Sequence, residues 1–175
     1  YGRSGNGFIE ANSNSTSYEI GDEPKQYVQK FADIIVSVDN NRVHGIKKLT
    51  ELHPELKVIL LDDAFQHRSV KPALSIMLTD HSNMYYNDKL LPVGMLREQI
   101  SGVARADVII VTKTPDNFTP MEQRIILKEI KARPHQLVYF SFITYSEPIS
   151  YWGVNEKVKR LAQFKEENYS VLMLT

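Results

Sequence analysis

The chain has 175 residues, of which 42% are hydrophobic and 24% charged, and its 21 basic residues balance its 21 acidic ones. This neutral balance argues against a general nucleic-acid binder, and the absence of cysteine excludes disulfide scaffolds and cysteine-based zinc sites. No apolar run approaches the roughly 20 residues of a membrane-spanning helix. Because the chain starts without Met, we expect that a segment before Tyr1 is missing.

The first part of the chain predicts a loop, then helices around a strand. Residues 1–19 are rich in Gly, Ser and Asn and are predicted to be largely loop. A helix is predicted over Pro24–Phe31, with Asp22 as its candidate cap, and the apolar run Ile34–Val38 predicts a strand. The segment Arg42–Leu52 places apolar residues on one face and predicts a second helix.

Further along, short runs are apolar throughout rather than alternating, which is typical of strands covered on both faces. Between them, Thr119-Pro120-Met121-Glu122 has the signature of a capping box and opens a predicted helix with Ile126, Leu127 and Ile130 inward. Strand and helix alternation at this spacing predicts one α/β domain over residues 1–175, with a parallel sheet and helices on both faces. The apolar runs are Val58–Leu61, Leu74–Leu78, Val108–Thr112, Leu137–Phe142 and Val171–Leu174.

Two acidic residues, Asp62 and Asp63, directly follow the apolar run Val58–Leu61. In open α/β sheets ligands bind at the carboxyl ends of the strands, where a carboxylate can hold Mg²⁺ beside a nucleotide phosphate. The pattern alone is more often that of an Asp that caps a loop or a helix. The residues that follow, Gln66, His67 and Arg68, concentrate polar groups at a density that a purely structural loop rarely needs.

Two more segments offer candidate site residues. In Gly21-Asp22-Glu23-Pro24, Asp22 is either a helix cap or a general base near a substrate hydroxyl. In the turn-rich segment Leu90–Glu98, Arg97 either clamps a phosphate or forms a surface salt bridge. The chain contains no G-x-x-x-x-G-K-[ST] sequence and therefore no P-loop.

Together these segments resemble the tetraacyldisaccharide 4'-kinases, in order and along nearly the whole chain. Asp62–Arg68 is similar to the D-D-G-F-Q-H-R of that family and Leu90–Glu98 to its L-L-P-x-G-x-L-R-E, and these two motifs are specific. Ala64 stands where the family has Gly, and Gln99 where Pro is common. The other similar segments are Tyr1–Arg3 with Gly7-Phe8, Gly21–Pro24, Asp39–Val43 and Val171–Thr175.

The resemblance implies a P-loop-type α/β fold with a smaller second lobe. It implies an ATP- and Mg²⁺-dependent transferase that phosphorylates the 4'-hydroxyl of a tetraacyldisaccharide 1-phosphate, a lipid A precursor. It places the enzyme at the cytoplasmic face of the Gram-negative inner membrane, and we expect peripheral membrane contact through segments missing from this chain. No nucleic-acid partner is implied.

The resemblance also assigns roles to residues of this chain. Asp22 becomes the candidate catalytic base, and Asp62 and Asp63 become the catalytic carboxylates that hold the metal. The remaining contacts are Gln66, His67 and Arg97 near the nucleotide, Arg42 and Arg97 on phosphate groups, and Tyr1 and Arg3 toward the lipid head group.

The missing P-loop leads us to expect a partial chain that does not turn over alone. The main alternative is a nucleotide- or anion-binding α/β module without catalysis that uses the same sheet edge. A third possibility is a structural piece with no independent activity, whose unpaired sheet edge would favour aggregation.

Overall fold

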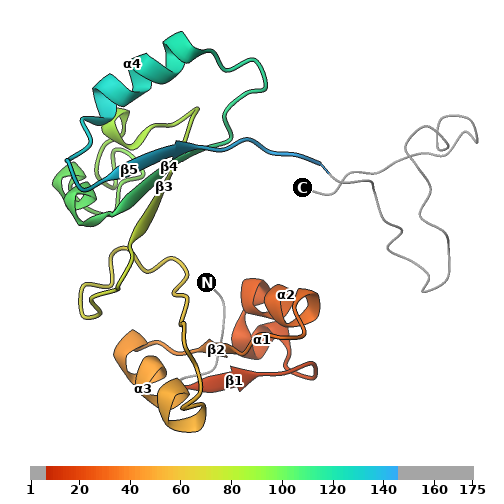
Figure 1. Cartoon of the computed structure of the whole chain (residues 1–175). Helices are drawn as coiled ribbons and strands as arrows, with labels where there is room; N and C mark the ends of the chain where they lie inside the picture. The colour runs from red at the N-terminus through yellow and green to blue at the C-terminus, as the bar shows by residue number, and fades with distance from the viewer. Residues whose placement is uncertain (1–6, 146–175) are drawn as a thin grey trace, which may run out of the picture.

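The structure, a computed structural model, describes residues 7–145 and contains two small sheets, each with its own helices (Figure 1). Residues 53–75 connect the two groups of elements without forming a helix or a strand. The first group comprises β1 (Ile9–Ala11), α1 (Ser17–Ile20), α2 (Asp22–Lys30), β2 (Val36–Val38) and α3 (Arg42–Leu52). The second comprises β3 (Ile76–Asp80), the 3₁₀ turns η1 (Tyr85–Asn87) and η2 (Ile100–Arg105), β4 (Val108–Thr112), α4 (Pro120–Ile130) and β5 (Leu137–Phe140).

In the first group, β2 pairs with β1 in an antiparallel ladder, with Ile9 opposite Val38. The predicted strand at Ile34–Val38 is therefore present in shortened form, but it does not join the parallel sheet. The predicted helix Arg42–Leu52 is confirmed as α3, and the Asn41 side chain caps it by accepting from the amide of His44. Only Ile20, Gly45 and Leu49 are buried in the helices of this group.

The second group confirms the predicted parallel α/β sheet. Strand β4 lies in the centre, with β3 and β5 parallel on either side, and α4 connects β4 to β5. The register aligns Ile109 with Met77 on one side and with Val138 on the other. The predicted strand at Leu74–Leu78 is shifted to Ile76–Asp80, because the pairing with β4 begins at Ile76 and continues to Asp80.

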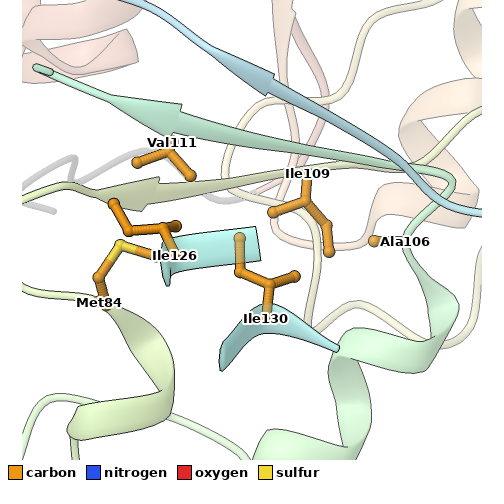
Figure 2. Close-up of a cluster of buried hydrophobic side chains, with 6 residues drawn as sticks. All are labelled: Met84, Ala106, Ile109, Val111, Ile126 and Ile130. Carbon is orange, nitrogen blue, oxygen red and sulfur yellow. The ribbon is translucent and has the colours of Figure 1, made fainter. Parts of the chain in front are cut away.

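One face of this sheet carries the main core. Ile109 and Val111, which alternate along β4, are fully buried against Ile126 and Ile130 of α4 (Figure 2). Met84 and Ala106 complete the buried cluster from the turns that flank the sheet. Burial of this kind is the dominant stabilising term for a small α/β domain.

The opposite face of the sheet is open among the described residues. Ile76, Leu78 and Tyr139, which point away from α4, are 49%, 65% and 53% exposed. The helix that the sequence predicts for the second face therefore does not appear within residues 7–145. The expected strand Val171–Leu174 lies outside the described residues.

The predicted buried strand at Val58–Leu61 is wrong for this structure. These residues form no strand, and Val58 and Leu60 are 71% and 90% exposed. A strand is stabilised by hydrogen bonds to a neighbouring strand, and no described strand lies beside residues 58–61. The apolar run of the sequence is thus present without the pairing that would bury it.

The start of α4 shows that a local sequence signal was sufficient to predict where this helix begins. The capping box at Thr119 and Glu122 is confirmed, and Pro120 occupies the first turn of α4. Leu127 was predicted to face inward but is 39% exposed, because Ile126 and Ile130 already fill the core-facing stripe.

Among the described residues, no helix is both long and apolar enough to cross a membrane.

Candidate functional site

The segment Asp62–Arg68, which we call the acidic loop, is stabilised by local hydrogen bonds. One carboxylate oxygen of Asp62 accepts from the amide of Asp63 at 2.9 Å, and both side chains are exposed. Asp63 has φ 44°, in the left-handed region that Asp tolerates better than most residues. The backbone turns at Asp63, whereas Ala64 has no positive φ, so Ala in place of the family's Gly introduces no backbone strain at that position.

The loop contacts Arg97 across 34 residues of sequence. The Arg97 guanidinium donates to Oδ2 of Asp63 at 2.7 Å. The segment that carries Arg97 is closed on itself, because Asp88 accepts from the amide of Met95 and Leu96 bonds to Lys89 and Leu91. The structure therefore brings together Asp63 and Arg97, two residues that the sequence predicted for one site.

Arg105 makes a second connection to the same loop. Its guanidinium donates to the carbonyl of Phe65 at 3.1 Å and lies 4.7 Å from the centre of the Phe65 ring. The same nitrogen donates to Glu98 at 2.6 Å. Arg105 could not be recognised from the sequence, since it lies in no motif and its partners Phe65 and Glu98 are 40 and 7 residues away.

Asp22 begins α2 instead of capping it. The N-cap is Gly21, with φ 95°, and no side chain caps this helix. The prediction of Asp22 as the cap is therefore wrong, which leaves its exposed carboxylate without a capping role. Tyr27 lies in the same helix, α2, and its hydroxyl donates to Asp62 at 3.2 Å. The Asp62 carboxylate raises the pKa of Tyr27. Tyr27 thus connects the helix of Asp22 to the acidic loop.

Arg42 lies at the start of α3, in a polar cluster of its own. Its guanidinium donates to the carbonyl of Asp39, whose buried carboxylate lies 2.6 Å from Nδ1 of His44 and accepts from the amide of Asn41. Gly45 makes this approach possible, since an added Cβ would lie 3.0 Å from the Cβ of Asp39. No hydrogen bond in the described part of the chain joins Arg42 to the acidic loop, so these two parts of the predicted site remain separate.

A further polar pair and a cavity lie at the carboxyl edge of the parallel sheet. Lys113 contacts Asp80 at 2.7 Å and, with Ser82, holds the pKa of Asp80 well below its usual range. Beside it is a cavity of about 320 Å³ at the ends of β4 and β5. The cavity is lined by Thr114, Pro115, Asp116, Phe118, Phe140 and Phe142. None of the predicted nucleotide contacts lines it.

Comparison with known proteins decides the family. The model of the tetraacyldisaccharide-1-P 4'-kinase family matches residues 1–166. The chain belongs to this family. A tetraacyldisaccharide 4'-kinase of Bacteroides thetaiotaomicron is 41% identical over 181 aligned positions, covering 100% of this chain and 48% of that protein. Relatives of the same name from Parabacteroides distasonis and Flavobacterium johnsoniae are 51% and 41% identical, covering 84% and 98% of this chain and 40% and 50% of theirs.

The chain therefore spans about half the length of the curated relatives that it matches. No solved structure matches it. Tyr1 and Arg3 lie outside the described residues, while Gln66 and His67 are exposed in the acidic loop. Among residues 7–145, no group of three or more His, Cys, Asp or Glu side chains is arranged to hold a metal ion.

Proposed function

We propose that the protein carrying this chain transfers the γ-phosphate of ATP to the 4'-hydroxyl of a tetraacyldisaccharide 1-phosphate in lipid A biosynthesis. The family match over residues 1–166 carries this proposal. Its supporting geometry is the contact between Asp63 and Arg97, since each comes from one of the two most specific motifs. We also propose that the enzyme works at the cytoplasmic face of the Gram-negative inner membrane, where such a lipid would be available.

The proposed base and the proposed metal ligands lie on connected elements. Asp22 and Tyr27 are five residues apart on α2, about 7.5 Å along the helix axis, and Tyr27 donates to Asp62. Because residues five apart in an α-helix are about 140° apart around its axis, Asp22 and Tyr27 lie on different sides of α2, and the connection runs through the helix itself. Phosphoryl transfer depends mainly on positioning and charge neutralisation, so a connection between these elements is what the reaction needs.

The acidic loop fits Mg²⁺ as a pair of ligands. Mg²⁺ in phosphoryl-transfer sites keeps several waters and uses one or two carboxylates together with substrate phosphates, so a cage of three side chains is not required. Asp62 and Asp63 are adjacent and exposed, and would hold the ion. Bound there with ATP, Mg²⁺ would neutralise charge on the transferred phosphoryl group. Arg97, already 2.7 Å from Asp63, would contact the same phosphates.

A separate cavity at the carboxyl edge is a second candidate for nucleotide binding, because the acidic loop bonds to Arg105 at the amino end of β4 instead. Its volume of about 320 Å³ lies at the lower end of the range for small-molecule pockets. The rings of Phe118, Phe140 and Phe142 give it an apolar lining against which a base can pack, although the planes of Phe118 and Phe140 are tilted by 37°. It is open at the sheet edge where ligands bind in α/β folds.

The direct test is Asp63→Asn in the protein expressed from its complete open reading frame. We expect the transfer of phosphate from ATP to a tetraacyldisaccharide 1-phosphate to fall by about 100-fold or more, because a metal-side charge is lost. Asp33→Asn, an exposed acid outside the loop, is the matched control and should retain activity. Full activity in Asp63→Asn, with equal thermal stability, would show that Asp63 does not act in the reaction, whereas a folded wild type without activity would favour the binding module without catalysis.

The flanking coding sequence gives an independent test. The proposed reaction requires a phosphate-binding loop that the 175 residues do not contain. An in-frame G-x-x-x-x-G-K-[ST] upstream of Tyr1 would agree with the kinase. A start codon directly before Tyr1, with no such loop, would favour the non-catalytic module and would explain a chain that does not turn over alone.

A further inference from the structure

Arg105 contacts both segments that meet at the ion pair between Asp63 and Arg97. Its partner Phe65 lies two residues after Asp63, and its partner Glu98 directly follows Arg97. The three residues Phe65, Glu98 and Arg105 therefore bracket the ion pair, and we call them the arginine clasp. Through Phe65 the clasp also reaches the buried cluster, against which that ring packs.

The clasp is better shielded from water than the ion pair that it brackets. The side chains of Arg97 and Asp63 are 53% and 69% exposed, whereas those of Arg105 and Glu98 are 35% and 27% exposed. Exposed ion pairs contribute little to stability, because solvent screens them and both side chains lose rotamer freedom. The pair between Asp63 and Arg97 is thus too weak to fix the acidic loop by itself, and an additional restraint is needed.

Arg105 is suited to provide that restraint. It lies at the end of η2, next to Ala106, which is fully buried, so its backbone is anchored to the core. A guanidinium presents several donors in a fixed plane and stacks on aromatic rings, which lets it contact a carbonyl, a ring and a carboxylate at once. Gly102 leaves room for the pair, since an added Cβ would lie 2.8 Å from the carboxyl group of Glu98.

We propose that Arg105 is a positioning residue. It holds the acidic loop and the Arg97 segment in the relative orientation in which Asp63 meets the metal and phosphate. The metal and phosphate part of this inference rests on the proposed function. Arg105 itself would touch neither the metal nor the phosphate in this arrangement. It acts through Phe65 and Glu98, and its loss leaves the ion pair of Asp63 and Arg97 to break and reform freely.

The experiment compares Arg105→Met and Arg105→Lys with Arg124→Met in the protein from the complete open reading frame. Arg124, exposed on α4, is the matched control. Hydrogen exchange is followed at the amides of His67 and Arg68, which bond within the loop. We expect Arg105→Met to accelerate this exchange about tenfold, corresponding to one hydrogen bond to a charged group, without changing exchange in β4. Arg105→Lys should be intermediate, because it retains the charge but not the planar fork.

A second measurement addresses the metal. Mg²⁺ is titrated with a non-hydrolysable ATP analogue, and protection of the same two amides gives its midpoint. For Arg105→Met we expect the midpoint to rise several-fold, with a matching rise in the Mg²⁺ requirement of lipid phosphorylation and little change in KM for the lipid. If Arg105→Met unfolds, Phe65→Leu, which keeps the carbonyl but removes the ring, carries both measurements.

Several outcomes would overturn the inference. Unchanged exchange in folded Arg105→Met shows that the clasp does not hold the loop. Faster exchange with an unchanged Mg²⁺ midpoint shows a structural role alone, and Arg105→Lys equal to wild type shows that charge suffices without the bridge. If wild type fails to phosphorylate lipid, the proposed function fails, and exchange at His67 and Arg68 still decides whether Arg105 holds the loop.

Discussion

The two groups of elements are stabilised by different interactions. In the parallel sheet group, β4 and α4 bury a continuous apolar cluster. In the group of β1 to α3, Ile20 and Leu49 are the buried hydrophobic side chains among the described residues, and polar interactions dominate. The acidic loop lies between the groups in sequence and bonds to both, through Tyr27 on one side and Arg97 on the other.

The polar interactions of the first group include helix caps and a contact between two elements. Thr16 and Glu19 form a capping box on a helix of only 4 residues, and Asn41 caps α3. His53 lies 2.9 Å from Glu10, which connects the end of α3 to β1. Such contacts contribute little individually, so this group should open more readily than the sheet.

The largest stability effect is expected from Ile109→Ala in the centre of the sheet. Removing this fully buried side chain loses transfer free energy and leaves a cavity under α4, for a loss of about 2–5 kcal/mol. Ile109→Val, at about 0.5–1.5 kcal/mol, is the graded control in urea unfolding. Leu49→Ala should lie near the lower end of the same range, because its thinly packed surroundings can collapse around it. Equal losses at Ile109 and Leu49 would contradict the contrast between the groups.

A smaller effect is expected from the cap of α4. Thr119→Ala removes the side-chain oxygen that accepts from the amide of Glu122, and should lower the free energy of unfolding by about 0.5–2 kcal/mol. Thr119→Ser keeps the oxygen and should stay close to wild type. If Thr119→Ala leaves the urea midpoint unchanged, the burial of Ile126 and Ile130 alone determines where this helix begins.

Features of the fold that depend on residues close together in the sequence were mostly predicted correctly, whereas several features that depend on residues far apart in the sequence were not. Local signals were sufficient for the capping box of α4, the bounds of α3 and the centre strand of the sheet. The run Val58–Leu61 failed because a strand also needs a neighbour, and no residue within the run specifies one. The antiparallel pairing of β2 was missed for the same reason.

The candidate site shows the same limit. The motifs placed Asp63 and Arg97 in one site, and the structure brings them into contact. Nothing in the motifs pointed to Arg105, whose partners lie 40 and 7 residues away. Residues that touch a ligand can be recognised by their chemistry, whereas residues that position them are chosen by geometry. The roles assigned to all of these site residues, including Asp62, Asp63 and Arg97, remain predictions.

The smallest predicted effect is a pH dependence confined to the polar group. The hydrogen bond from His53 to Glu10 raises the pKa of His53, with a further contribution from Glu55. Since the folded pKa lies above the unfolded value of about 6.5, the contact stabilises fully below that value and is lost as pH rises through the folded pKa. Glu10→Gln should therefore lower the urea midpoint more at about pH 5.5 than at about pH 8.5.

The sheet group provides the matched control for this experiment. Its cluster of Ile109, Val111, Ile126 and Ile130 contains no titrating group, so Ile109→Val should shift the midpoint equally at both pH values. A Glu10→Gln effect that is also equal at both would show that Glu10 stabilises through packing alone. A difference seen only in exchange at α3 and β1, with β4 unchanged, would show that the two groups open as separate units.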